Sequence, residues 1–343
     1  MSLSRREMMM QGAALAALAT GKPFSAFAET PGRRIKWQNW SGGQSSLPEA
    51  RLAPTDAAEV ADFIASSPKP IRPVGTGHSF TALVPTDGTI MSLDRLSGVL
   101  ETNNETMEAT IGAGSKLGDL GAPLEEKGQA LINMPDINRQ TLAGSISTST
   151  HGTGENFGSL SSYVTGLELV TASGDTVWCD KDNKPDLFQA ARVSLGSLGI
   201  MTKIRLQNRT PHRINKRTWV VPFDEMMEQA DTFAAENRNF EFYYIPFSSM
   251  CMGISHNETD EPLAPSTAED NDGIMTLKAL ADYLSWSPSL REYFIRSALE
   301  DLPDETFVDT SWKVYPSARN VRFNEMEYHL PRENALDALK EIR

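Results

Sequence analysis

Two short segments of this chain combine glycine, hydroxyl side chains and one histidine each. The first is Gly75-Thr76-Gly77-His78-Ser79-Phe80, and the second runs from Gly144 to Gly154 and ends in His151-Gly152-Thr153-Gly154. Because glycine has no Cβ, successive backbone N–H groups in such loops can converge on an anion. Together the two segments predict a site that wraps a pyrophosphate.

The spacing of these glycines disfavours several familiar motifs. Phe80 stands where a dinucleotide-binding GxGxxG needs its third glycine, and no Lys-Ser or Lys-Thr pair closes a P-loop. Gly77-His78-Ser79-Phe80-Thr81 lacks the final glycine of a nucleophile elbow. A nicotinamide Rossmann fold and a GxSxG hydrolase are therefore disfavoured.

His78 is the residue of the first loop that most needs an explanation. A histidine between Gly77 and Ser79 on a tight turn projects its ring from an exposed backbone. The alternative is a turn histidine that only hydrogen-bonds to backbone. The loop by itself does not separate these two interpretations.

Strands and helices alternate around the two loops. A Thr55-Asp56 cap precedes a helix expected over 57–66, and a short strand at 71–74 leads into the first loop. Further along we expect a helix at 117–127 and a hairpin around Gly174-Asp175. The other elements expected in this half are strands at 89–93, 106–111 and 200–206 and a helix at 186–193.

A second unit is expected after residue 212, where the first α+β pattern is complete. Strands are expected at 219–223, 241–245 and 322–327, helices at 225–236, 283–301 and 332–342, and a polar loop at 256–272. At 343 residues the chain has the length of two domains. Its 40% hydrophobic and 22% charged residues are typical of a soluble globular protein.

Charge and ligand spacing disfavour two classes of partner. The formal net charge of −13 argues against nucleic acid, because most of the surface would repel phosphates. Cys179 and Cys251 form no CxxC and the five histidines are dispersed, so no metal site is expected. We interpret the two cysteines as small buried hydrophobic residues, although an oxidising compartment would allow them to pair.

The first 28 residues have the pattern of an export signal. Arg5-Arg6 precedes an uncharged stretch from Met8 to Thr20, and Ala26-Phe27-Ala28 supplies a cleavage site. The stretch is too short to cross a bilayer as a helix, and no membrane association is visible elsewhere. The arginine pair resembles a twin-arginine signal, which implies the Tat export machinery as a partner and a periplasmic or exported protein. The alternative is a frayed amphipathic terminus.

Five segments resemble, in order, the sugar-lactone and alditol oxidase branch of the vanillyl-alcohol-oxidase type of flavoprotein. That branch includes the L-gulonolactone oxidases, the D-arabinono-1,4-lactone oxidases and the alditol oxidases. Arg72 to Phe80 resembles the first FAD-binding loop of the family. The other segments are Trp37 to Gly42, Ala143 to Gly154, Asp186 to Ile200 and Glu327 to Glu333. The resemblance covers about residues 37–340.

The resemblance implies an α+β fold with FAD as cofactor. After the signal at 1–28, a two-subdomain PCMH-type FAD-binding domain would occupy 29–212 and an α/β substrate domain 213–343. His78 occupies the position that in many members bonds covalently to the flavin 8α carbon, which outweighs the turn-histidine interpretation. The residues implied in FAD binding are Gly75, Thr76, Gly77, His78, Ser79, Thr141, Gly144, Thr148, Ser149, Thr150, His151 and Ile200.

The implied chemistry is hydride transfer from the CH–OH of a sugar lactone or polyol to flavin N5, followed by reoxidation by O₂ or another acceptor. Asn133-Met134-Pro135-Asp136 falls where the family lays residues beside the isoalloxazine. Pro135 sits at an oxygen-gating position, which favours an oxidase over a dehydrogenase. Asp136 replaces the serine that alditol oxidases present to substrate, and it is a candidate for substrate contact or for capping a turn.

The sequence departs from the family at its end. Family members continue beyond Arg343 through a Glu/Arg strand and a His-Trp-x-Lys motif, so we expect an incomplete substrate domain. The chain is then either a fragment or a degenerate form that binds FAD without efficient turnover. A carbohydrate-binding or hydrolytic protein without flavin is the third interpretation.

Overall fold

A computed structural model describes residues 34–266, 272–300, 302–317 and 321–342. Contacts within the chain place the described residues from Lys36 onward in one compact unit. The export signal expected at 1–28 lies outside the described residues and stays a prediction. None of the described helices is both long and apolar enough to cross a membrane.

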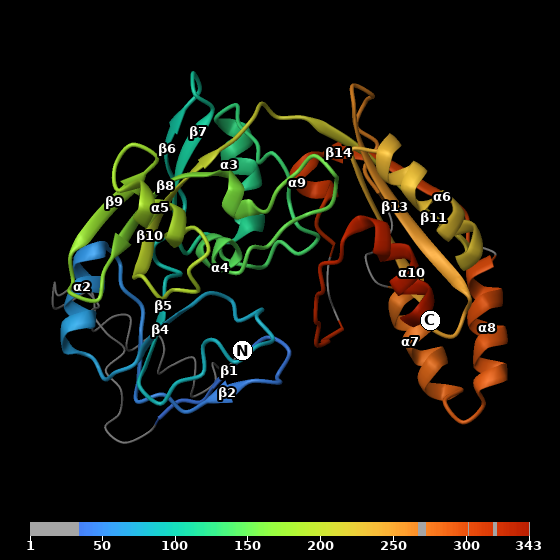
Figure 1. The fold of residues 1–343 in the computed structure, drawn as a ribbon, viewed down its shortest axis with the longest axis horizontal. Helices are drawn as coiled ribbons and strands as arrows, with labels where there is room; N and C mark the ends of the chain where they lie inside the picture. Colours follow the sequence, from blue (N-terminus) through green and yellow to red (C-terminus); the bar gives the residue numbers. More distant parts are fainter. Residues whose placement is uncertain (1–33, 267–271, 301, 318–320, 343) are drawn as a thin grey trace, which may run out of the picture. The chain divides into compact units, whose positions relative to one another are not determined.

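A small parallel sheet carries the first glycine loop (Figure 1). Its strand order is β3-β5-β4, and helix α2 connects β3 to β4. The Asp56 side chain caps α2 by accepting a hydrogen bond from the Glu59 backbone N–H at 2.8 Å. The elements of this part are β1 Trp37–Gln38, β2 Ser45–Ser46, β3 Ala50–Leu52, α2 Ala57–Ser66, β4 Ile71–Val74 and β5 Thr89–Ser92. Because β4 ends at Val74, the glycine loop begins at its carboxyl end.

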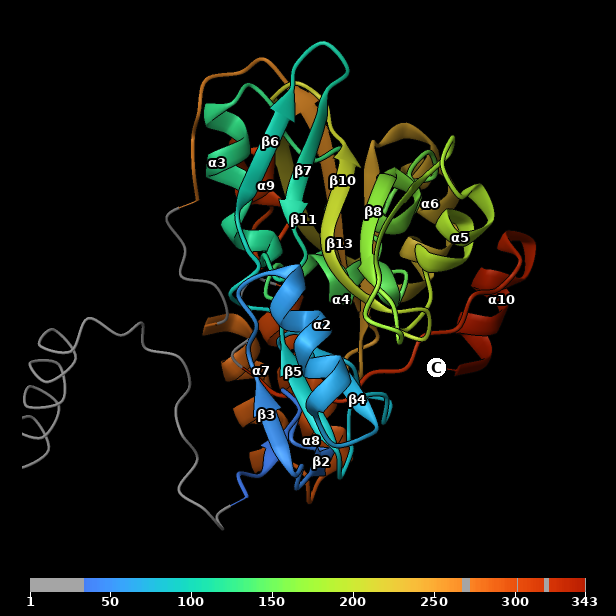
Figure 2. The same ribbon diagram turned by 90° about the vertical axis from the view of Figure 1, so that its left-hand side faces the viewer.

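A five-stranded antiparallel sheet follows, with the order β6-β7-β10-β8-β9. Figure 2 shows four of its strands, β6, β7, β10 and β8, side by side. Its strands are β6 Val99–Asn103, β7 Glu108–Gly112, β8 Val164–Val170, β9 Thr176–Asp180 and β10 Ile200–Gln207. The short helices around it are η1 Leu117–Asp119, α3 Gly121–Glu126, α4 Leu142–Ser147, η2 Leu160–Tyr163 and α5 Pro185–Ala191. Gly174, at φ +88°, makes the turn between β8 and β9, which confirms the predicted hairpin.

One apolar core joins these two sheets. Val60 of α2 and Met91 of β5 belong to the same buried cluster as Ile111 of β7, Ile146 of α4 and Ile204 of β10. Both glycine loops therefore start from elements anchored in a common interior.

A four-stranded antiparallel sheet occupies the second half of the chain, in the order β12-β13-β11-β14. Its side chains alternate: Trp219 and Cys251 face a cluster that includes α6 and α10, whereas Val220 and Met250 pack with α7 and α8. The elements are β11 Arg213–Pro222, α6 Phe223–Glu236, β12 Asn239–Ile245, β13 Met250–Thr259, α7 Asp272–Tyr283, α8 Pro288–Glu300, β14 Glu305–Thr310, α9 Ser311–Val314 and α10 Arg332–Ile342.

The predicted α+β class is confirmed, with a five-stranded and a four-stranded sheet in successive parts of the chain. The predicted domain boundary after residue 212 falls between the last strand of one sheet, β10, and the first strand of the other, β11. Cys179 lies in β9 and Cys251 in β13, and both are buried, as expected for small hydrophobic residues; no disulfide joins them.

Several expected elements differ from the structure. Residues 322–327 form no strand, because no described strand pairs with them. The helix expected at 117–127 is divided into η1 and α3, since Gly118 and Gly121 weaken a continuous helix. The helix expected at 283–301 is α8, which begins later, at Pro288, a residue that is favourable in a first turn. Helix α7, Asp272–Tyr283, was not expected.

Candidate flavin-binding site

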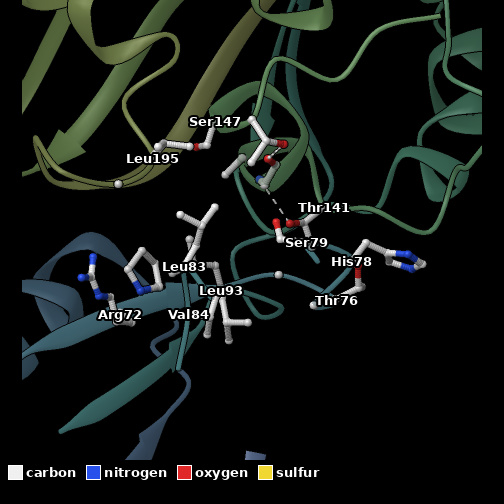
Figure 3. A pocket seen from close by; sticks show the side chains of 18 of the residues that line it. Arg72, Thr76, His78, Ser79, Leu83, Val84, Leu93, Thr141, Ser147 and Leu195 are labelled. Atoms are coloured by element: carbon white, nitrogen blue, oxygen red, sulfur yellow. Dashed lines mark hydrogen bonds between the residues drawn. The ribbon is translucent and has the colours of Figure 1, made fainter. Parts of the chain in front are cut away.

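Both glycine loops line one cavity (Figure 3). The predicted cofactor residues that line it are Gly75, Thr76, Gly77, His78, Ser79, Thr141, Gly144 and Thr148. Ser149, Thr150, His151 and Ile200 are not among its lining residues, although Gly199 and Met201, the neighbours of Ile200, are. The structure thus brings together two segments that lie about 70 residues apart in the sequence.

The two loops touch at a point where only glycine fits. A Cβ on Gly75 would lie 2.1 Å from Thr141 Oγ1, and a Cβ on Gly144 would lie 2.9 Å from the same atom. Thr141 caps α4 by accepting a hydrogen bond from the Gly144 backbone N–H at 3.4 Å. Gly77 has φ +74°, a conformation that side chains disfavour. Backbone therefore borders the cavity without intervening side chains, which fits a bound pyrophosphate.

The remaining lining residues were not predicted as cofactor-binding residues from the sequence. In Figure 3, Arg72 and His78 lie on opposite sides of the cavity, with Leu83, Val84 and Leu93 between them. The other missed lining residues are Trp37, Pro73, Val74, Thr81, Gln140, Ala143, Ser147, Leu195, Gly196, Gly199 and Met201. Arg72 belongs to the Arg72–Phe80 segment that resembles the first FAD-binding loop. A cation next to a predicted phosphate loop could therefore have been predicted as a lining residue. Leu83 and Val84 follow no periodic pattern that would have marked them. A cation, polar backbone and an apolar patch together suit the phosphates and rings of FAD.

The ring of His78 is held by an aromatic neighbour. It stacks on Trp40 with ring centroids 4.9 Å apart and planes 23° apart. Phe80 and Phe323 contact the same indole, at centroid distances of 6.5 Å and 5.1 Å. Burial lowers the pKa of His78 below its ordinary value, and the charge of Arg139 lowers it further. The imidazole is therefore neutral near pH 7 and keeps an unprotonated ring nitrogen.

His151 of the second loop has the opposite environment. Its Nδ1 lies 2.9 Å from the Gly152 carbonyl, and its Nε2 lies 2.6 Å from Glu327 Oε1. Partial burial opposes the charged ring, but these hydrogen bonds and the charges of Glu327 and Asp136 outweigh it and raise the pKa of His151. His329 Nε2 lies 3.6 Å from the same Glu327 oxygen. The structure thus assembles three exposed potential metal ligands, His151, Glu327 and His329, that the sequence spacing did not predict.

The segment from Asn133 to Asp136 contacts the second glycine loop. Asn133 Nδ2 donates a hydrogen bond to the Thr153 carbonyl at 3.0 Å, and Pro135 is buried. The Asp136 carbonyl accepts a hydrogen bond from the Ser317 backbone N–H at 2.8 Å. Pro135 and Asp136 do not line the cavity of Figure 3, but the charge of Asp136 acts on His151.

Two family models match successive parts of the chain. Residues 48–180 match the FAD binding domain, and residues 204–343 match the D-arabinono-1,4-lactone oxidase family. Together they cover both glycine loops and the four-stranded sheet.

Curated relatives and solved structures agree with these matches. A Mycobacterium tuberculosis L-gulono-1,4-lactone dehydrogenase is 34% identical over 89% of this chain and 73% of its own length. L-Gulonolactone oxidase from Bos taurus is 28% identical over 90% of this chain and 72% of its own. A cholesterol oxidase structure from Brevibacterium sterolicum covers 94% of this chain and 70% of that chain, with a TM-score of 0.72 and 17% identity, and so supports the fold alone. The chain belongs to the FAD-linked sugar-lactone oxidoreductase family.

Proposed function

We propose that this protein is an FAD-dependent oxidoreductase that oxidises a CH–OH group of a sugar 1,4-lactone, with polyols as the second substrate class. The observation that carries the proposal is the single cavity lined by both glycine loops, in a chain 34% identical to an L-gulono-1,4-lactone dehydrogenase. In the reaction the substrate carbon loses a hydride, the hydroxyl loses a proton, and a carbonyl group forms.

The residues proposed to hold FAD come from both loops. The backbone N–H groups around Gly75 and Gly77 and the guanidinium of Arg72 are suited to the pyrophosphate. Thr141 and Thr148 add hydroxyl groups on the side of the second loop. When bound, FAD supplies the hydride acceptor, and the protein supplies orientation and electrostatics.

His78 is proposed as the covalent attachment residue. Its lowered pKa leaves an unprotonated ring nitrogen near pH 7, and stacking on Trp40 restricts the ring. Attachment would join that nitrogen to the flavin 8α carbon. It would release one proton from the carbon, one proton from the imidazole and two electrons, which O₂ would accept to become H₂O₂.

The electron acceptor of the catalytic cycle is proposed to be O₂. Pro135 at the oxygen-gating position supports this choice, and its burial beside the second glycine loop is compatible with it. A dehydrogenase is the second candidate, because the 34% identical relative carries that name. Asp136 is proposed to contact a substrate hydroxyl.

We further propose that the protein is exported through the Tat machinery, because Arg5-Arg6 resembles a twin-arginine signal. Cell fractionation that compares the wild type with an Arg5→Lys/Arg6→Lys variant tests this proposal.

Anaerobic reduction of the bound flavin tests the main proposal. The purified protein is loaded with FAD and mixed with L-gulono-1,4-lactone, D-arabinono-1,4-lactone or a linear polyol, and the visible flavin absorption is followed. Bleaching by a lactone supports the proposal. Stable flavin absorption with every compound would contradict it and leave a flavin-binding protein without turnover. Admitting air or an artificial dye to the bleached protein then separates an oxidase from a dehydrogenase.

A further inference from the structure

A largely buried arginine lies where the four-stranded sheet meets the Asn133–Asp136 segment. Arg238 immediately precedes β12, and only 10% of its side chain is exposed. We propose that Arg238 and Asn239 are positioning residues that hold the Asn133–Asp136 segment and the Thr153 carbonyl in one fixed arrangement beside the flavin. The inference rests on the proposed function, which places that segment next to the isoalloxazine.

The guanidinium of Arg238 donates hydrogen bonds from all three of its nitrogens. Nη2 donates to the Ile132 carbonyl at 2.7 Å, one residue before Asn133. Nη1 donates to Tyr315 Oη at 2.5 Å and to Asn239 Oδ1 at 2.6 Å, and Nε donates to Glu258 Oε1 at 2.9 Å. A lysine could not make these contacts at once, because its ammonium lacks the planar fork.

Asn239 links Arg238 to Asn133 and to the Thr153 carbonyl. Its Oδ1 accepts from Arg238, so its Nδ2 must point the other way, where it donates to Asn133 Oδ1 at 3.2 Å and to the Thr153 carbonyl. Asn133 Nδ2 donates to the same carbonyl at 3.0 Å. Asn133 and Asn239 are only 2% and 1% exposed, so water does not replace these bonds.

The backbone around these side chains is packed as closely. A Cβ on Gly154 would lie 2.5 Å from the Arg238 carbonyl, and a Cβ on Gly152 would lie 2.3 Å from the Met134 carbonyl. The Arg238 guanidinium also lies 4.2 Å from the ring centroid of Phe157. The second glycine loop is thus held between the start of β12 and the Asn133–Asp136 segment.

The charges of this cluster favour positioning over simple stabilisation. Hydrogen bonds from Arg209 and Arg238 lower the pKa of Glu258 to about 2, so this carboxylate balances the arginines at neutral pH. The Glu258 side chain is 41% exposed, so the ion pair itself adds little net stability, whereas the planar guanidinium of Arg238 demands one geometry. The hydrogen bond from Arg238 to the Ile132 carbonyl therefore fixes the backbone position of Ile132 and Asn133.

The test compares Arg238→Met with Arg217→Met in the full chain. Arg217 lies in the same sheet, pairs with Asp304 at 2.7 Å and is half exposed, so it is the matched control. Trypsin reports on the segment directly, because Arg139 is exposed and is the one tryptic residue between 128 and 150. We expect cleavage after Arg139 to be about tenfold faster in Arg238→Met, with or without FAD, and unchanged in Arg217→Met.

Two further readouts address the flavin and the reaction. The visible circular dichroism of bound FAD should change in Arg238→Met, and kcat per bound flavin should fall about 10- to 100-fold with little change in KM. Asn239→Ser is the milder variant if Arg238→Met does not fold, and it should show the same changes at smaller size.

The outcomes separate the two proposals. Wild-type cleavage at Arg139 together with an unchanged flavin spectrum in Arg238→Met and Asn239→Ser would overturn the inference. A lower melting temperature with unchanged kcat per flavin would also overturn it, because the arginine would then be structural only. If the wild type oxidises no lactone while cleavage and flavin dichroism respond to the variants, the proposed function fails and the positioning role stands.

Discussion

The two glycine loops have similar compositions but shift the pKa values of their histidines in opposite directions. In the first loop, His78 is stacked on Trp40 and burial lowers its pKa. In the second, His151 is hydrogen-bonded to Glu327 and its pKa is raised. The first loop therefore disfavours a protonated imidazole, whereas the second favours one. The difference shows that loop composition indicates where a site lies, whereas residues from elsewhere in the chain determine the pKa of its histidine.

The largest expected effect is the loss of covalent flavin when His78, but not His151, is replaced. His78→Ala should abolish covalent flavin, because it removes the proposed nucleophilic nitrogen, whereas His151→Ala should retain it. The measurement is flavin fluorescence of acid-precipitated, denatured protein after loading with FAD. Equal fluorescence in His78→Ala and wild type, or none in wild type, would contradict the covalent proposal.

The next effect is a loss of FAD affinity when the contact between Gly75 and Thr141 is disturbed. Gly75→Ala places a methyl group 2.1 Å from Thr141 Oγ1, so the loops must separate, and FAD affinity should fall about 10- to 100-fold. Titration of the apoprotein with FAD measures it. Gly174→Ala, at a positive φ in a remote hairpin, is the control for general strain and should leave the affinity unchanged.

A second-site change sharpens the same prediction. Thr141→Ala removes the obstructing atom at a modest cost in the cap of α4, about 1 kcal/mol. The Gly75→Ala/Thr141→Ala protein should therefore bind FAD better than Gly75→Ala alone. Additive losses would mean that the contact between Gly75 and Thr141 does not set the affinity.

Much of the fold and of the first loop could be predicted from the sequence. Gly75 to Ser79 form a continuous motif, and all five residues line the cavity. The α2 cap and the β8–β9 hairpin are also local, because neighbouring residues determine them.

The remaining site features depend on contacts between distant segments. Leu83 and Val84 reach the cavity from a stretch without periodicity, and Arg238 meets Ile132 across 106 positions. Glu327 meets His151 across 176 positions, from a segment that was expected to be a strand. Such pairs leave no mark on local spacing, so one sequence could not predict them.

A smaller effect is expected from Trp40, the residue that distinguishes the surroundings of His78. Trp40→Ala removes the stacking partner and should slow covalent flavin attachment about tenfold, since an aromatic pair contributes roughly 0.5–1.5 kcal/mol. Trp40→Phe keeps an aromatic face and should attach flavin at close to the wild-type rate. The time course of acid-stable flavin fluorescence measures both. Equal attachment rates in Trp40→Ala and wild type would show that stacking on Trp40 does not promote covalent flavin attachment.

The smallest effect is the pH dependence of the His151–Glu327 pair. Because folding raises the pKa of His151, the stabilisation is fully present below the ordinary value of 6.5 and is lost as pH rises through the higher folded value. The side chains are 42% and 54% exposed, so the contribution should not exceed about 1 kcal/mol. Glu327→Gln should lower the free energy of unfolding near pH 6 and leave it unchanged near about pH 9.

Two further groups face this pair and have to be separated from it. Asp136 also raises the pKa of His151, and His329 lies 3.6 Å from Glu327. A double-mutant cycle of His151→Asn and Glu327→Gln, measured by denaturant unfolding at both pH values, isolates the direct interaction. The coupling should be present at the lower pH and vanish at the higher. A coupling that is independent of pH would mean that protonation of His151 does not carry the interaction with Glu327, and the contrast between the two loops would not hold.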